Sequence, residues 1–443
     1  MVARRPQRAP RPLDPGRYHG LMAISTPTVT DICLAAKAAA APLAALGADV
    51  KDRALHAIAD ALVARTPEIL EANAEDLEAG RANAIGDALL DRLALDPQRI
   101  EAIAAGTRAI AALPDPVGET IDGHRLPNGV DVRRVRVPFG VVAVVYEARP
   151  NVTIDAAALC LKSGNAIVLR GSSTAIHSNR VLAAIAAEAA ADAGVPEGAI
   201  QLVAGGGREE LAELATQDGV VDLIFPRGGE GLKNALKAVA TVPVIYAASG
   251  NCHLFVDADA DLDDAEAILL NGKTQRPGVC NALETLLVHA DAAPAFLPRA
   301  ARALHDAGVE LRGDERARAL AGPGVPVALA SEEDWATEYL ALTLAVRVVD
   351  SVAEAIAHVG RYGSGHSEAI VTRSTESARA FQLGVDAACV YVNASTRFTD
   401  GGEFGMGAEI GNSTQKLHAR GPIGVRELTT FKYLIEGTGQ VRA

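Results

Sequence analysis

Short apolar runs alternate with alanine-rich or amphipathic stretches between residues 140 and 246. The apolar runs have the length of buried strands, and the stretches between them carry the apolar period of helices. Connections this short predict a parallel sheet covered by helices on both faces. The predicted strands are 141–146, 166–170, 200–203, 221–225 and 242–246, and the predicted helices are 154–162, 177–193, 209–217 and 231–240.

Four other segments extend this pattern. Residues 30–113 have helical periodicity, and residues 252–392 form a second α/β series. Residues 132–137 alternate apolar and basic side chains, which predicts a strand with one face in solvent. We expect that strand to form either a surface hairpin or an arm between subunits. Residues 428–434 alternate like an edge strand, a candidate for pairing with another subunit.

The first 21 residues differ from the rest of the chain. They hold five arginines among four prolines and show no periodicity. This composition predicts disorder, because few apolar side chains are present to bury. A basic arm that binds nucleic acid is the alternative interpretation.

The overall composition is that of an ordinary globular protein. The 443 residues suffice for two or three domains, and the 49% share of hydrophobic residues allows a large core. A net charge of −13 argues against a general nucleic-acid binder. No apolar run approaches the ~20 residues that span a bilayer, and we expect no secretory signal. Neither a membrane nor a nucleic acid is therefore an expected partner.

The five cysteines are scattered, odd in number and without metal-ligand spacing. This usage predicts a reducing, cytoplasmic location and no metal site.

Cys280 lies in a loop of sequence QRPGVCN, residues 275–281, between a predicted helix and a predicted strand at 283–289. Proline and glycine before the cysteine leave little side-chain bulk, which favours presentation of the thiol to a cleft. We expect Arg276 to favour the thiolate, which is the nucleophilic form. Cys280 is therefore a candidate nucleophile. The alternative is a small buried hydrophobic residue, the usual state of a free cysteine.

Two glycine-rich turns are candidates for binding a dinucleotide phosphate. Gly206 lies at the centre of one, and Arg227, Gly228 and Gly229 form the other. Each turn lies between a predicted strand and a predicted helix, where backbone N–H groups can bind phosphate, and each is equally compatible with a plain turn. No G-x-G-x-x-G motif opens the first turn between a strand and a helix, and the sequence has no G-x-x-x-x-G-K-[ST] motif. The motifs therefore do not favour one turn over the other.

The end of the strand at 166–170 bears on which dinucleotide binds. Arg170 ends this strand and is followed closely by Ser172 and Ser173. An NAD site usually has a carboxylate in this place for the ribose hydroxyls. An arginine with hydroxyl groups suits the 2′-phosphate of NADP instead. The alternative is that Arg170 faces solvent.

Five longer motifs resemble those of the γ-glutamyl phosphate reductase family, which belongs to the aldehyde dehydrogenase superfamily. The motifs are 145–153 (VYEARPNVT), 272–281 (GKTQRPGVCN), 335–339 (WATEY), 362–366 (YGSGH) and 393–405 (NASTRFTDGGEFG). The resemblance extends from residue 28 to the C-terminus. It implies an α/β fold with a Rossmann-like cofactor domain, an α/β catalytic domain and a small β element for oligomerisation.

The resemblance also implies boundaries and an activity. The expected regions are a disordered extension at 1–27, a cofactor domain at 28–128 and 142–252, a catalytic domain at 253–412, and oligomerisation or edge-strand elements at 129–141 and 413–443. The implied reaction is NADPH-dependent reduction of L-glutamyl 5-phosphate to L-glutamate 5-semialdehyde and phosphate, the second step of proline synthesis from glutamate. A homo-oligomer is expected, with a glutamate kinase as a transient partner.

Three residues acquire roles from the resemblance. Cys280 corresponds to the catalytic cysteine, and Asn151 to the asparagine of the oxyanion hole. Glu338 corresponds to a carboxylate that binds the cofactor ribose, although the usual Phe-Gly-Pro after it is replaced by residues 340–342 (LAL). The implied mechanism is thiolate attack on the acyl phosphate, loss of phosphate to leave a thioester, and hydride transfer to that thioester.

The substrate's α-carboxylate and α-ammonium groups need partners of opposite charge. Arg397 is the candidate for the carboxylate, and a structural ion pair is its alternative role. Glu147 and Arg149 flank Asn151 and are further candidates for the substrate.

Three other functions compete with this hypothesis. A cofactor-free cysteine hydrolase or acyltransferase needs a base beside Cys280, and the sequence identifies none. A catalytically inactive scaffold does not require Cys280 and Asn151. An oxidative aldehyde dehydrogenase needs a carboxylate that activates water, and no carboxylate lies between Glu230 and Asp257. We therefore expect phosphate, not water, to accept the acyl group in the reverse reaction.

Overall fold

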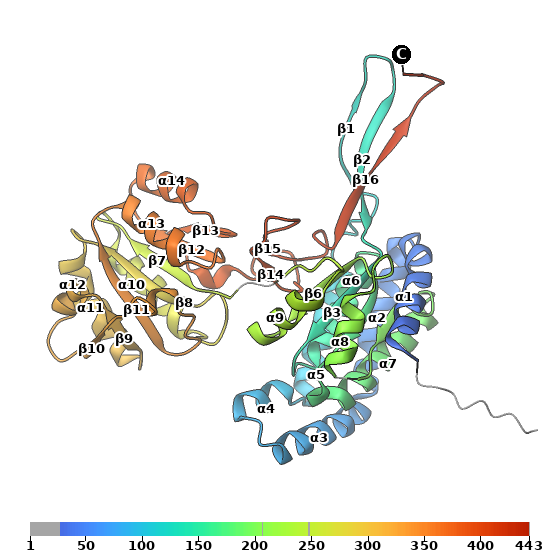
Figure 1. Cartoon of the computed structure of the whole chain (residues 1–443), viewed down its shortest axis with the longest axis horizontal. Coiled ribbons are helices and arrows are strands. Elements are labelled where there is room, and N and C mark those ends of the chain that lie inside the picture. Colours follow the sequence, from blue (N-terminus) through green and yellow to red (C-terminus); the bar gives the residue numbers. More distant parts are fainter. Residues whose placement is uncertain (1–26, 206, 247–248, 443) are drawn as a thin grey trace, which may run out of the picture.

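The computed structural model describes residues 27–205, 207–246 and 249–442. The predicted extension, apart from its last residue, and Gly206 lie outside these ranges. Figure 1 shows two α/β units joined through a short β segment, and a β arm that extends from the first unit.

The first unit contains a parallel sheet with the strand order β5-β4-β3-β6. Its strands are β3 (Val141–Tyr146), β4 (Ala166–Arg170), β5 (Ile200–Leu202) and β6 (Leu223–Arg227). Helices α6 (Asn151–Lys162), α7 (Ile176–Asp192), α8 (Arg208–Ala215) and α9 (Glu230–Val239) connect or follow these strands. Every residue of β3 and β4 is buried, as continuous apolar runs predict for a sheet covered on both faces. The predicted α/β series is confirmed, and two strands match residue for residue.

One strand prediction in this unit is shifted and another is wrong. The strand predicted at 221–225 exists but spans Leu223–Arg227, and Asp222, which pairs with Lys37, lies directly before it. The strand predicted at 242–246 is absent, and only one isolated bridge joins Val244 to Ile224. Pro243 lacks an N–H group, which limits how far this segment can pair.

Five helices precede the sheet and confirm the helical periodicity of residues 30–113. They are α1 (Val29–Ala44), α2 (Ala48–Ala64), α3 (Thr66–Ala82), α4 (Asp87–Leu93) and α5 (Pro97–Ala111). Thr28 and Asp31 form a capping box that begins the first of them. The buried face of α2 includes Leu55, Ile58 and Leu62, and it belongs to the same core as β3.

The second unit has a separate core and a parallel sheet of the order β10-β9-β11-β8-β7-β12-β13. Its strands are β7 (Cys252–Val256), β8 (Leu283–His289), β9 (Glu310–Gly313), β10 (Val327–Leu329), β11 (Thr343–Val349), β12 (Ser367–Val371) and β13 (Cys389–Val392). Its helices are α10 (Leu262–Thr274), α11 (Ala293–Asp306), α12 (Glu315–Leu320), α13 (Val352–Tyr362) and α14 (Thr375–Gly384). The second α/β series is thus confirmed.

The arm is an antiparallel sheet of the order β1-β2-β16. Its strands are β1 (Thr120–Arg125), β2 (Asp131–Pro138) and β16 (Thr429–Glu436). The edge strand predicted at 428–434 exists and pairs along its length with β2 of the same chain, from Thr429 opposite Pro138 to Glu436 opposite Asp131. The short strands β14 (Asn412–Ser413) and β15 (Gly421–Pro422) lie between the two units in Figure 1.

Candidate active site

The loop of Cys280 joins α10 to β8 and lies against the segment that enters β7. Cys280 is half-buried. The Cys252 thiol donates to the Cys280 carbonyl oxygen over 3.2 Å. A Cβ atom on Gly250 would lie 1.5 Å from that same oxygen, so only glycine allows this approach of the two backbones. These contacts therefore fix the backbone of the Cys280 loop against the segment that enters β7.

The charges around the thiol come from both units. Burial raises the pKa of Cys280, Arg227 opposes this effect, and the carboxylates of Glu409 and Glu338 add to it. The expectation that Arg276 favours the thiolate needs correction, because the cation with the largest effect on this pKa is Arg227, at the end of β6. Arg276 itself is exposed.

Asn151 is the first residue of α6, directly after the loop that follows β3. Its side-chain amide donates to Asp155 Oδ2 over 2.9 Å, which orients the group. Burial raises the pKa of Asp155 to about 6, while the hydrogen bond from Asn151 and the charge of Arg227 oppose this shift. The charge of Arg227 thus lowers the pKa of both Asp155 and Cys280.

Arg149 and Arg397 approach the thiol from opposite units. Arg149 is exposed, but partial loss of hydration lowers its pKa, the charges of Arg227 and Arg276 lower it further, and Cys280 opposes them. Burial and Arg276 lower the pKa of Arg397, and Cys280 again opposes them. Arg397 lies in a short 3-10 helix at Thr396–Phe398, and its Nε donates to Gln275 Oε1 over 2.8 Å.

Glu147 lies at the glycine turn that precedes α9. Its Oε2 accepts the N–H of Gly229 over 3.1 Å. A Cβ atom on Gly228 would lie 2.7 Å from the carboxyl carbon of Glu147, so the glycine allows this close contact. A carboxylate of the chain itself therefore binds one N–H group of this predicted phosphate turn.

The other predicted phosphate turn also contacts a carboxylate. Glu210 Oε2 accepts the N–H of Gly207 over 2.5 Å. A Cβ atom on Gly205 would lie 1.6 Å from Glu210 Oε1. The central glycine of this turn, Gly206, lies outside the described residues.

Arg170 is buried at the end of β4, which excludes the alternative that it faces solvent. Its Nη2 donates to the Gly207 carbonyl oxygen over 2.8 Å. Ser172 follows with its hydroxyl buried and without a partner among the described residues, and Ser173 is exposed. A buried hydroxyl without a partner beside a guanidinium fits a site for an anionic group.

Glu338 binds the segment that enters β7, where its Oε1 accepts the N–H of Gly250 over 2.6 Å.

Sequence reasoning did not identify Glu409. Burial raises the pKa of Glu409 to about 7, Arg227 opposes the shift, and Asp400 adds to it. Glu409 accepts the N–H of Gly401 over 3.0 Å and the side-chain amide of Asn412 over 3.1 Å. Its position in a glycine-rich stretch directly after the motif at 393–405 was the available signal.

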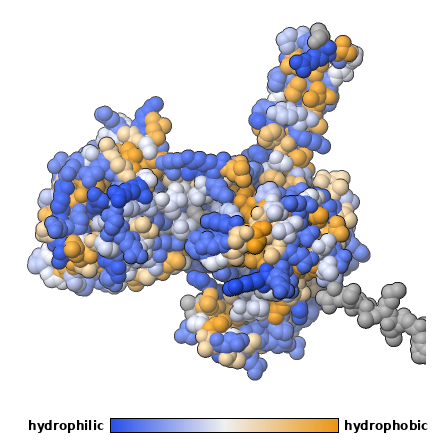
Figure 2. All heavy atoms as spheres, in the orientation of Figure 1, coloured by the Kyte–Doolittle hydropathy of each residue, from blue (hydrophilic) through white to orange (hydrophobic). Residues whose placement is uncertain are grey.

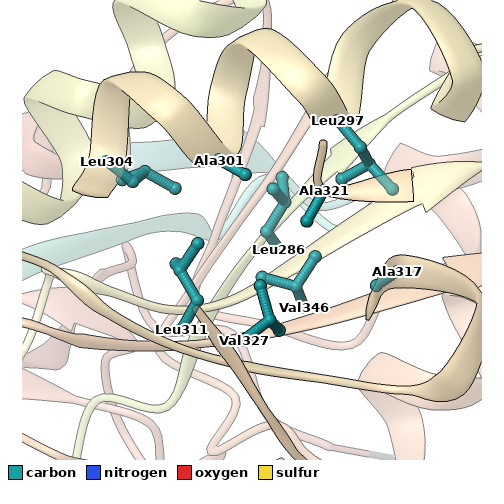
Figure 3. A pocket seen from close by; sticks show the side chains of 9 residues that line it. All are labelled: Leu286, Leu297, Ala301, Leu304, Leu311, Ala317, Ala321, Val327 and Val346. Carbon is teal, nitrogen blue, oxygen red and sulfur yellow. The ribbon is translucent and has the colours of Figure 1, made fainter. Parts of the chain in front are cut away.

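The apolar cavity in Figure 3 is not part of this site. Its volume is about 10 Å³, room for at most one water molecule, and aliphatic side chains from the core of the second unit line it. Within the described ranges, no group of three or more His, Cys, Asp or Glu side chains is arranged to hold a metal ion. No helix in the part of the chain that the structure describes is long and apolar enough to cross a membrane.

Comparisons with known proteins agree with the resemblance found in the sequence. The aldehyde dehydrogenase family model matches residues 12–323. The γ-glutamyl phosphate reductase of Thermobifida fusca is 58% identical over 92% of this chain and 97% of its own length. That of Moorella thermoacetica is 57% identical over the same shares of both chains.

Solved structures confirm the predicted fold class. The γ-glutamyl phosphate reductase of Thermotoga maritima superposes with a TM-score of 0.92 at 45% identity, covering 94% of this chain and all of that one. An acetylating aldehyde dehydrogenase from Geobacillus thermoglucosidasius shares the fold, with a TM-score of 0.67 at 19% identity over 94% of this chain and 97% of that one. The chain belongs to the aldehyde dehydrogenase superfamily and, within it, to the γ-glutamyl phosphate reductase family.

Proposed function

We propose that this chain reduces L-glutamyl 5-phosphate to L-glutamate 5-semialdehyde and phosphate through a thioester on Cys280, with NADPH as the reductant, in proline biosynthesis. The observation that carries the proposal is the 58% identity to a γ-glutamyl phosphate reductase over nearly the whole chain, combined with a half-buried thiol among charged groups from both units.

Cys280 attacks the acyl carbon, and the phosphate leaves with the electron pair of the broken C–O bond. Asn151 and the backbone N–H of Cys280 stabilise the negative oxygen of the tetrahedral adduct. Because burial raises the pKa of the Cys280 thiol, attack requires a group that accepts its proton. Glu409, with a pKa of about 7 and an electrostatic effect on the thiol, is our candidate for this group.

NADPH, when bound, supplies the hydride that reduces the thioester. We propose Arg170, Ser172 and Ser173 as the residues that hold its 2′-phosphate, because the buried Arg170 is followed two residues later by Ser172, whose buried hydroxyl has no hydrogen-bond partner among the described residues. Glu338 is proposed for the ribose.

We also propose that Arg397 binds the α-carboxylate of the substrate. No salt bridge to Arg397 occurs among the described residues, so the alternative role as a structural ion pair has no support there.

Three further proposals concern the protein in the cell. The arm supports a homo-oligomer, since its edge strand exposes large apolar side chains. The five free cysteines suit a reducing compartment, and we propose the cytoplasm. A glutamate kinase is proposed as a transient partner, because an acyl phosphate is labile in water.

The reverse reaction tests the proposed chemistry. With glutamate semialdehyde and NADP⁺, reduction of the nucleotide should rise with phosphate concentration and approach zero without phosphate. Cys280→Ala should abolish turnover without changing the melting temperature, whereas Cys389→Ala, at the other half-buried thiol, should keep it within a fewfold of the wild type. Brisk oxidation without phosphate would identify an oxidative aldehyde dehydrogenase instead, and substantial activity of Cys280→Ala would exclude the thioester.

A further inference from the structure

The backbone segments that carry Arg149 and Arg227 are joined at the carboxyl edge of the first sheet. Tyr146 and Arg227 are opposite one another at the ends of the neighbouring strands β3 and β6. The N–H of Glu147 donates to the Arg227 carbonyl oxygen over 3.2 Å, and Arg149 follows two residues later. In open α/β sheets this edge is where ligands bind.

Arg149 is exposed and Arg227 is half-buried, and within the described ranges no carboxylate lies within ion-pair distance of either guanidinium. Other arginines, such as Arg134 and Arg312, do form ion pairs. The two cations also repel each other, and the charge of Arg227 therefore lowers the pKa of Arg149. Near pH 7 Glu409 compensates these charges only in part, because a pKa of about 7 leaves it about half protonated. Asp155, with a pKa of about 6, is mostly ionised and accepts a hydrogen bond from Asn151. This arrangement favours a bound anion.

Both guanidinium groups lie within electrostatic range of the nucleophile. Arg227 lowers the pKa of Cys280, and Cys280 raises that of Arg149. The side chain of Arg227 also packs on Gly411, where a Cβ atom would lie 2.9 Å from Nη1. This packing limits the positions that the Arg227 guanidinium can take.

The chemistry of the substrate indicates which anion this is. When the sulfur forms its bond to the acyl carbon, the phosphate is attached to that same carbon through one oxygen. The C–O bond then breaks, and the phosphate takes its electron pair and gains negative charge. The α-carboxylate, by contrast, lies at the far end of the substrate. The anion closest to the sulfur is therefore the phosphate.

We propose that Arg149 and Arg227 form the binding site for the phosphate group of the acyl phosphate, and for inorganic phosphate in the reverse direction. This inference rests on the proposed function and gives Arg227 a role different from the cofactor binding predicted from its glycine turn. The other phosphate that can reach this edge is the diphosphate of the cofactor, and the experiment must separate the two.

The test uses Arg149→Gln, Arg227→Gln and Arg227→Lys, with Arg92→Gln as the control. Arg92 also acts on Arg149, but it lies on the exposed surface of α4. In the reverse reaction, each Gln variant should raise the KM for phosphate by about 10- to 100-fold and leave the Kd for NADPH within about threefold. Arg227→Lys should recover part of the loss, because it keeps the charge but not the fork of donors. Arg92→Gln should remain near the wild type.

A second measurement does not depend on turnover. Cys280 is alkylated with iodoacetate, an anion, and with iodoacetamide, which is neutral. The ratio of the two rates should fall severalfold in both Gln variants, and inorganic phosphate should protect the thiol in the wild type but not in these variants. Melting temperatures confirm that the variants are folded.

The outcomes separate the possibilities. A raised Kd for NADPH with an unchanged KM for phosphate would assign the arginines to the cofactor and overturn the proposal. Unchanged alkylation ratios and unchanged phosphate protection would also overturn it. If the wild type did not turn over glutamate semialdehyde, the proposed function would fail, while phosphate protection that depends on both arginines would still support an anion site.

Discussion

Gly250 allows the loop of Cys280 to pack closely against the segment that enters β7. Its missing side chain leaves room for the Cys280 carbonyl oxygen, which would lie 1.5 Å from a Cβ atom. Gly250→Ala should therefore force two backbone segments apart, cost about 1–3 kcal/mol of stability and lower kcat at least tenfold. Enzyme assays and thermal denaturation measure both effects.

Gly278→Ala is the matched control in the same loop. Its Cβ atom would meet nothing closer than the Leu340 carbonyl oxygen at 3.8 Å, an ordinary contact. Near-normal activity of Gly250→Ala would show that the loop tolerates displacement and that the contact does not position Cys280.

The raised pKa of Glu409 predicts how the stability of the protein depends on pH. Its pKa is raised from 4.5 to about 7 in the folded protein, so the folded state binds this proton more tightly than the unfolded chain. The free energy of unfolding contributed by this group therefore falls as the pH rises from about 4.5 to about 7. Glu409→Gln should remove that fall and stabilise the protein by about 1–3 kcal/mol at pH 8 relative to pH 4.5.

Denaturant titrations of Glu409→Gln and of the exposed control Glu403→Gln at both pH values would measure this difference. If the two variants showed the same pH profile, the raised pKa of Glu409 would not be a property of the folded protein in solution. Loss of activity in Glu409→Gln alone, at all pH values, would support its candidacy as the acceptor of the thiol proton.

At the scale of elements, one buried ion pair joins α10, β8 and the loop that carries Glu338. Lys273 and Glu284 are fully buried and 2.6 Å apart. Lys273 also donates to the Leu283 carbonyl oxygen, and Glu284 accepts the N–H of Leu340. Leu340 has a φ of +52°, a strained conformation for a leucine, which this hydrogen bond helps to hold.

Lys273→Met should cost about 3–5 kcal/mol, because it leaves the Glu284 carboxylate buried without its partner. The double variant Lys273→Met/Glu284→Gln should regain most of that loss. Urea denaturation of the two single variants and the double variant gives the coupling energy. Additive losses would show that the two side chains do not stabilise each other.

At the scale of the whole molecule, the arm is the expected contact between subunits. Phe431, Tyr433 and Ile435 lie on one face of β16, since alternate residues of a strand share a face. Tyr433 is 57% and Ile435 65% exposed, and Figure 2 shows apolar residues along the arm. Exposed apolar side chains on a projecting edge strand indicate a surface that another chain covers.

The double variant Tyr433→Lys/Ile435→Lys should therefore shift the expected oligomer towards monomers. Its dissociation constant should rise at least tenfold, because burial of each large apolar side chain contributes about 1.5–3 kcal/mol to association. Light scattering coupled to size-exclusion chromatography measures this shift. Lys432→Gln, on the opposite face of the same strand, should leave the assembly unchanged. An unaltered mass of the double variant would assign the oligomer contact to another surface.

The sequence by itself determined the features that depend on local pattern. The apolar runs of β3 and β4 are continuous and bounded by turns, so burial on both faces follows from their side chains alone. The five long motifs carried the family resemblance, which the comparisons confirmed. The segment at 242–246 has the same apolar character, but Pro243 and its place at the edge of the sheet limited it to one bridge.

Only the tertiary structure decided which distant groups meet. The proximity of Arg227 to Cys280, of Glu409 to both, and of Glu338 to Gly250 depends on how two separate sheets and the segment between them pack. The pairing of β16 with β2 of the same chain joins residues about 300 positions apart. Periodicity along the chain encodes which face of an element is buried, but the partner of a polar side chain is set by packing between elements.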